Sequence, residues 1–325
     1  MTSPTLFEQP PLPFSPPVAQ TVLRRSAVPA LLFVVTMFTT TAVGMRYMHN
    51  FVAGQSPLGG DADVLPFVWM FHNLSSLTSG LPFSITLVGI LLAHEFGHYF
   101  ACRFSGVKAT LPYLIPAPSL SGTFGAVIRL KSRVRTRAAL IVIGAAGPVM
   151  GFVVALGTVT YGLMHSTYAA QPVMHRIQAP LLVALLQRAL NDGQDLSLVV
   201  PHPVLVASWI GLLITALNLI PAGQLDGGHI VYAFSPRLHK VCSVIVIAGM
   251  FVLGILSWAG WLVWAGILMM PGMRHPKVQN EEQLGRGLMV LLPVCAVILI
   301  MCATYQPFQG YSVVDLFHKL PTRYR

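Results

Sequence analysis

Long apolar runs separated by short polar segments make up most of the chain after residue 26. One helix over the apolar stretch 241–271 would be ~45 Å long, more than the ~30 Å hydrocarbon core, so we expect a tight hairpin near residues 257–261. The remaining runs are each close to the length that a membrane-spanning helix needs; they cover residues 27–44, 81–100, 138–164, 203–222 and 287–304. The pattern predicts an all-α polytopic membrane protein with about six to seven transmembrane helices.

Polar segments flank this apolar region on both sides. Residues 1–26 include "QPPLPFSPP" and predict a disordered, Pro-rich cytoplasmic tail. Residues 27–304 form the predicted membrane-embedded domain, and residues 305–325 a polar C-terminal tail. The first apolar run is long for a signal peptide and no Ala-x-Ala site follows it, so we expect a retained anchor.

The composition supports a membrane protein, because 54% of the residues are hydrophobic and only 9% are charged, whereas soluble domains carry about 25% charged residues. The formal charge is +10. We assign this excess of Lys and Arg residues to cytoplasmic loops and not to nucleic-acid binding, for which the chain has no motif. With the N-terminus inside, most Lys and Arg residues fall on the cytoplasmic side, but those beyond residue 271 do not fix the C-terminal topology. A basic stripe predicts contact with anionic lipid; it comprises Arg129, Lys131, Arg133, Arg135 and Arg137.

Polar residues interrupt the apolar run 81–100 at "HEFGH", residues 94–98. Residues four apart lie on one face of a helix, so His94 and His98 can bind one metal ion, with Glu95 beside them to transfer protons. Zinc suits this pattern, because it lowers the pKa of a bound water to about 7 and a nearby carboxylate can then take the proton. The alternative is a pair of helix histidines with ordinary hydrogen bonds, but polar clusters inside membrane segments usually serve a function.

A catalytic zinc site needs a third protein ligand, and the chain has only ten acidic residues. Most of them lie in tails or in predicted outer loops. Asp226, in "NLIPAGQLDGGH", follows a run that crosses the membrane in the same direction as the run carrying His94 and His98. All three residues are therefore expected towards the cytoplasmic side.

The residues around Asp226 are also compatible with an ordinary turn, since Asp and Gly are turn formers. However, Pro221 and Gly223 break the helix at membrane depth. Such a break is tolerated only where protein or water covers the freed backbone groups. This favours a site over a plain loop; His229, which follows, is compatible with a supporting role or with none.

Together these motifs resemble the site-2 protease family of intramembrane zinc metalloproteases over a core of about residues 81–235. "GTFGAVI" and "GAAGPVMG" are similar to that family's connecting region. The resemblance implies that His94, His98 and Asp226 bind Zn²⁺ and that Glu95 is the general base. It also implies that Asn218 contacts the substrate backbone or the oxyanion.

The resemblance further implies the substrate and the setting. The substrate would be a transmembrane helix of another protein, cut in or near the lipid bilayer during regulated intramembrane proteolysis. From the topology and the charge bias, the active site would lie towards the cytoplasmic side, and the membrane would be either a bacterial inner membrane or an organelle membrane. Residues 111–118 and 123–130 resemble the family's re-entrant β-hairpin, whose edge could pair with an unwound substrate strand, although a loop that merely packs on the bundle is the alternative.

Two other functions compete with an active protease. A catalytically inactive metal-binding homologue could act as a membrane regulator, but it would have no need of Glu95. A transporter would place acidic residues on several helices and show an inverted repeat, and the sequence shows neither. No polar segment is long enough for an added regulatory domain, so the spans themselves or an unidentified partner would control access.

Overall fold

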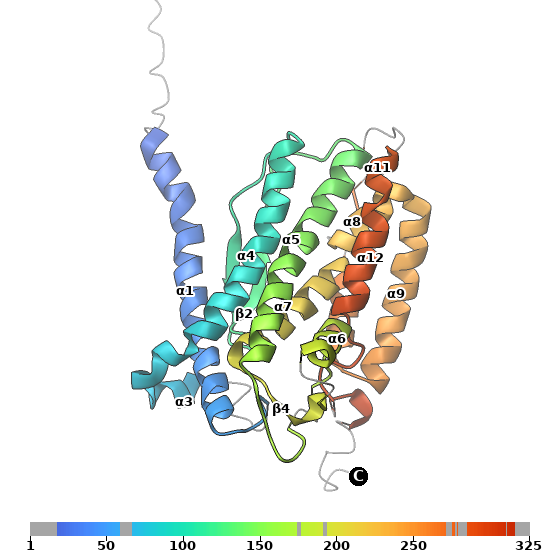
Figure 1. Cartoon of the computed structure of the whole chain (residues 1–325). Coiled ribbons are helices and arrows are strands. Elements are labelled where there is room, and N and C mark those ends of the chain that lie inside the picture. The colour runs from blue at the N-terminus through green and yellow to red at the C-terminus, as the bar shows by residue number, and fades with distance from the viewer. Residues whose placement is uncertain are drawn as a thin grey trace, which may run out of the picture.

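The chain folds into a bundle in which α1, α4 and α5 pack in succession, α12 packs on α5, and α9 packs on α8 and α10 (Figure 1). The computed structural model describes residues 18–58, 67–173, 177–190, 194–270, 275–276, 278, 285–309 and 311–315. The longer helices are α1 Val18–Val52, α4 Leu81–Phe104, α5 Arg137–Met164, α7 Pro203–Leu219, α9 Pro236–Leu256 and α12 Leu291–Cys302. The shorter ones are α3 Phe67–Phe71, η1 Leu74–Gly80, α6 Leu181–Leu190, η2 Leu196–Leu198, α8 Asp226–Phe234, α10 Gly260–Met269 and α11 Arg286–Met289.

Four helices in the described part of the chain are long and apolar enough to cross a membrane. They cover Ala27–Val52, Leu74–Phe104, Arg137–Met164 and Pro236–Leu256. The predicted runs 203–222 and 287–304 form helices that are shorter than expected. Proline lacks a backbone N–H and disfavours a helical conformation in the residue before it, and α7 ends at Leu219 just before Pro221.

The first helix differs from the sequence prediction at both of its ends, whereas the expected break near residue 257 is found. The first helix, α1, begins at Val18, inside the segment 1–26 predicted as a tail, and runs to Val52, beyond the predicted apolar run. Residues 1–17 lie outside the described residues. The expected break near residues 257–261 is present, because α9 ends at Leu256 and α10 begins at Gly260 and packs back against it.

A two-stranded antiparallel hairpin connects α4 to α5. It consists of β1 Tyr113–Pro116 and β2 Thr123–Val127. Its tip contacts the middle of α1, where the Thr39 hydroxyl donates to the Gly122 carbonyl (2.7 Å) and the Tyr47 hydroxyl donates to the Leu120 carbonyl (2.8 Å). The tip therefore contacts a candidate membrane span away from the ends of that helix, whereas β2 contacts α4. A second, unpredicted sheet joins β3 Thr167–Tyr168 to β4 Val199–Val200.

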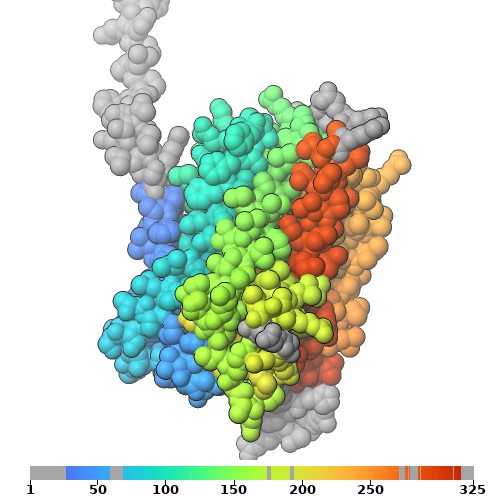
Figure 2. Space-filling view, in the orientation of Figure 1, coloured from blue at the N-terminus to red at the C-terminus, as the bar shows by residue number. Residues whose placement is uncertain are grey.

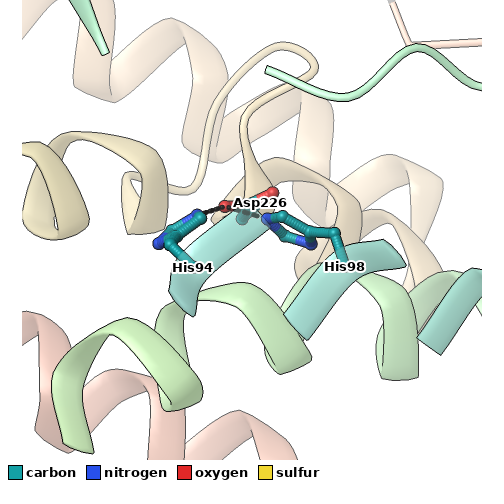
Figure 3. Close-up of side chains that lie close together, drawn as sticks. All are labelled: His94, His98 and Asp226. Atoms are coloured by element: carbon teal, nitrogen blue, oxygen red, sulfur yellow. Dashed lines mark hydrogen bonds and ion pairs between the residues drawn. The ribbon is translucent and has the colours of Figure 1, made fainter. Parts of the chain in front are cut away.

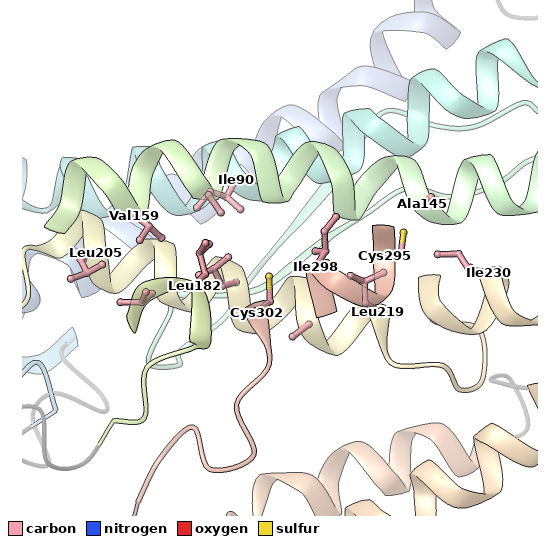
Figure 4. Close-up of a cluster of buried hydrophobic side chains, with 14 of the residues drawn as sticks. Ile90, Ala145, Val159, Leu182, Leu205, Leu219, Ile230, Cys295, Ile298 and Cys302 are labelled. Carbon is pink, nitrogen blue, oxygen red and sulfur yellow. The ribbon is translucent and has the colours of Figure 1, made fainter. Parts of the chain in front are cut away.

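The largest buried apolar cluster joins α4, α5, α7, α8 and α12 around α5 (Figure 4). It includes Ile90, Val159 and Leu205, and two free cysteines, Cys295 and Cys302, are buried in it. In the space-filling view, side chains of α4, α5 and α12 pack against one another across the centre of the face (Figure 2). By contrast, α9 exposes a row of valines and isoleucines, a surface that suits lipid and not water. The core thus holds α4 and α7 against α5, and these helices carry the polar motifs.

Candidate active site

The two histidines of "HEFGH" project from one face of α4 towards Asp226, as predicted (Figure 3). Asp226 Oδ2 lies 3.1 Å from His94 Nε2 and 3.3 Å from His98 Nε2. The three ligand atoms lie within 4.8 Å of one another, and both histidines are buried. Two imidazole nitrogens and one carboxylate oxygen are a donor set that zinc accepts, and a three-ligand site leaves a fourth position for water or substrate. The residues present therefore fit a catalytic zinc ion.

Asp226 reaches the histidines because the chain turns sharply after α7. Gly223 has φ = 58°, which glycine adopts without strain, and α8 starts at Asp226 directly afterwards. A side chain at Gly227 would overlap the carbonyl of Leu219 at the end of α7. The glycines of "LDGG" thus allow the first turn of α8 to pack against the end of α7 and fix the carboxylate over α4.

His98 is held in one tautomer by a backbone group of α5. Its Nδ1 lies 2.7 Å from the Ile143 carbonyl, an oxygen that can only accept, so Nδ1 carries the proton. In the neutral imidazole, His98 Nε2 is then unprotonated and available as a ligand. Ligating histidines in metal sites commonly have such an outer partner.

Small residues of α5 make room for the ligands. A methyl group at Gly147 would overlap the His98 ring, and one at Gly151 would lie 3.2 Å from atoms of His94. A methyl group at Gly144 would lie 3.1 Å from the Asp226 carbonyl oxygen. Small residues let helices approach closely, and at these three glycines of α5 the close contacts are with the candidate ligands.

Glu95 and Asn218 lie in the same cavity as the three candidate ligands. The cavity measures about 240 Å³ and is also lined by Ala126, Val127 and Ile128 at the end of β2. Glu95 is 6% exposed, and its carboxylate lies next to the backbone N–H of Ile128. The Asn218 side-chain amide lies 3.5 Å from His94 Nε2. The structure therefore brings together all five residues that the sequence singled out.

Two contacts at the site could not be found from the sequence. The Ile143 carbonyl is a backbone group, so no residue type signals it. His229 lines the cavity, and its Nδ1 lies 2.8 Å from Nε2 of His275. Because His275 Nδ1 faces the Pro276 carbonyl at 2.8 Å, the neutral pair has His229 donating to His275. Burial and the neighbouring histidines lower the pKa of His275 to about 4, which keeps it neutral at pH 7.

Comparison with known proteins gives a consistent result. The model of Peptidase family M50 matches residues 82–257. "Probable zinc metalloprotease EGY2, chloroplastic" of Arabidopsis thaliana is 30% identical over 314 residues, which are 90% of this chain and 53% of that protein. The protein of the same name from Oryza sativa subsp. japonica is 32% identical over 313 residues, 92% of this chain and 56% of that protein. The chain thus spans about half the length of these relatives.

Proposed function

The chain belongs to peptidase family M50, the site-2 protease family of membrane zinc metalloproteases, and from this we propose that it cleaves transmembrane helices of other proteins. One observation carries the proposal: a zinc ligand set and a buried carboxylate share a cavity on a membrane-spanning helix, beside the edge of a β-strand. The process is regulated intramembrane proteolysis, in which the cut falls in or near the bilayer.

In the proposed mechanism His94, His98 and Asp226 hold Zn²⁺. When bound there, the metal would polarise a substrate carbonyl and lower the pKa of a bound water. The Glu95 carboxylate takes a proton from the attacking water and delivers it to the leaving amine nitrogen. Burial of Glu95 supports this role, because a dry site strengthens every electrostatic interaction with the reacting atoms.

Asn218 is proposed to contact the substrate and not the metal. Its amide group lines the cavity beside His94, and an amide N–H can donate to a substrate carbonyl oxygen. A donor at that position would hold the scissile bond in place and stabilise negative charge on the oxygen as it develops.

The hairpin is proposed to be re-entrant and to receive the substrate. Residues of β2 line the cavity, while β1 covers only one edge of that strand. A helical peptide bond is protected by its own hydrogen bonds, so the substrate must unwind before cleavage. An unwound segment can then pair with the remaining edge of β2, which places its backbone beside Glu95.

The proposed architecture is a single membrane domain over residues 27–304 with six to seven spans and its motif-bearing core at 81–235. Polar tails at 1–26 and 305–325 flank it. The bias of basic residues supports a cytoplasmic N-terminus and an active site towards the cytoplasmic side. The membrane is a bacterial inner membrane or that of an organelle, such as the chloroplast that the names of the plant relatives give.

A cleavage assay with the purified full chain and a model transmembrane substrate tests this function. Wild type is compared with Glu95→Gln and with chelator-treated protein. We expect Glu95→Gln to retain zinc and to lose at least about a hundredfold in rate. Cleavage at the wild-type rate by this variant would refute the mechanism, and a zinc-loaded wild type that cleaves nothing would indicate an inactive metal-binding regulator.

A further inference from the structure

A second cavity adjoins the candidate active site, next to the segment that leads from β2 to α5. Its volume is about 590 Å³. It shares four lining residues with the active-site cavity: Leu130, Ile143, Gln224 and His229. An extended chain that leaves the active site can therefore continue directly into this second cavity. The proposed catalytic steps do not use it.

One stretch of backbone lines both cavities in succession. Residues 126–128 line the active-site cavity, and residues 130–134 line the second one. On its other side this stretch is held by residues 108–110: the Thr110 N–H donates to the Arg129 carbonyl (3.0 Å), and the Lys131 N–H donates to the Lys108 carbonyl (2.7 Å). The backbone that guides a substrate past Glu95 thus extends, fixed in position, into the second cavity.

The second cavity is basic. Both Lys131 and Arg133 line it with exposed side chains. None of the described residues that line this cavity is acidic. Two cations in a partly enclosed space favour a ligand that carries carboxylates.

Resting on the proposed function, we propose that the second cavity is a specificity subsite that takes acidic side chains of the substrate. Ile128 lies next to Glu95, and a chain advances at most ~3.3 Å per residue, so Lys131 and Arg133 lie at most ~10 Å and ~17 Å beyond the scissile bond. The preferred acidic residues are therefore about the third to fifth from the cleaved bond, on the flank that enters this cavity.

Anionic lipid, which the sequence suggests for the basic stripe, is the competing partner. The placement of the stripe favours the substrate. Lys131 and Arg133 line a cavity that shares walls with the active site, whereas Arg135 of the same stripe is exposed and lines neither cavity. Arg135 is therefore a matched control for charge that lies off the substrate path.

The test uses the full chain in neutral phosphatidylcholine vesicles with three transmembrane substrates. They carry two Asp, two Asn or two Lys at the third and fifth positions from the scissile bond, on one flank or on the other. We expect kcat/KM to be about threefold to tenfold higher for Asp than for Asn, the effect of one or two partly exposed ion pairs, and only on one flank. The double variant Lys131→Glu/Arg133→Glu should reverse the order, and Arg135→Glu should keep it.

Each other outcome has a defined meaning. Equal cleavage of the three substrates by wild type, or an unchanged order in the double variant, overturns the subsite. Repeating the assay with phosphatidylglycerol vesicles identifies a lipid anchor: the double variant would then lose rate on every substrate equally and only there, which also overturns the proposal. If zinc-loaded wild type cleaves none of the substrates, the proposed protease function itself has failed.

Discussion

A single methyl group at Gly147 tests the candidate zinc site. Gly147 lies on α5 against the His98 ring, so the Cβ of Gly147→Ala would overlap that ring. The ring has little room to move, because it is 7% exposed and its Nδ1 donates to the Ile143 carbonyl at 2.7 Å. Either His98 shifts or the α4–α5 contact opens.

The size of the effect follows from the geometry. Ordinary van der Waals contact begins at 3.4 Å, so the ring must retreat by about 1 Å, several times the ~0.2 Å tolerance of a metal–ligand distance. The retreat also strains the hydrogen bond to Ile143. Loss of such an outer partner costs about tenfold to a hundredfold in metal affinity, which is about 1.4–2.7 kcal/mol.

The assay is zinc affinity, measured by competition with a calibrated chelator on purified protein. Gly157→Ala is the matched control, because it lies on the same helix with no heavy atom within 4 Å of the new methyl group; its zinc affinity should equal that of wild type. A double-mutant cycle supplies a second check: Gly147→Ala should add little once His98→Ala has already removed the ligand. Wild-type zinc affinity in Gly147→Ala would refute the view that this glycine makes room for a ligating His98.

Three further predictions concern separate parts of the fold. Asp226→Ala removes one of three candidate ligands, so purified protein should retain less than half of its zinc after dialysis; undiminished zinc would exclude Asp226 from the site. Thr39→Val deletes a hydrogen bond to the hairpin tip and should lower stability by about 0.5–1.5 kcal/mol and raise KM with zinc content unchanged. Unchanged KM would show that the tip contact does not position the substrate strand. His202 Nδ1 accepts from the Val204 N–H at the start of α7, and burial, followed by the neighbouring His165, lowers the pKa of His202. The unfolded chain then binds the proton more tightly, so this contribution to stability is complete above pH ~6.5 and declines below it. Thermal unfolding in detergent should show that decline, and His202→Asn, which keeps a cap acceptor, should reduce it.

The sequence was sufficient to single out the candidate site because its residues have rare chemistry in an apolar chain. "HEFGH" inside a membrane-length run restricts the ligands to two histidines, and the scarcity of acidic residues leaves Asp226 as the third. Because the runs 81–100 and 203–222 are predicted to cross the membrane in the same direction, the two histidines and Asp226 are expected at the same depth. The structure confirms that they meet within hydrogen-bonding distance.

The sequence was insufficient where backbone geometry decides. Hydropathy gives the apolar part of α1 but not its full length, since helical hydrogen bonds continue past the apolar run to Val52. The same measure overestimates α7, because the helix ends at Leu219 while apolar residues continue beyond it. The carbonyl of Ile143 and the pairing of His229 with His275 depend on which groups face each other across the bundle.

The separation of the ligands along the chain has a consequence for biosynthesis. His94 and Asp226 are 132 positions apart, and α5 and α7 lie between them. At ~5–20 residues per second, a ribosome needs roughly 7–26 s to make that stretch. During this interval the nascent chain contains His94, Glu95 and His98 but lacks Asp226. The candidate metal site is therefore complete only after the central helices of the bundle have been synthesised.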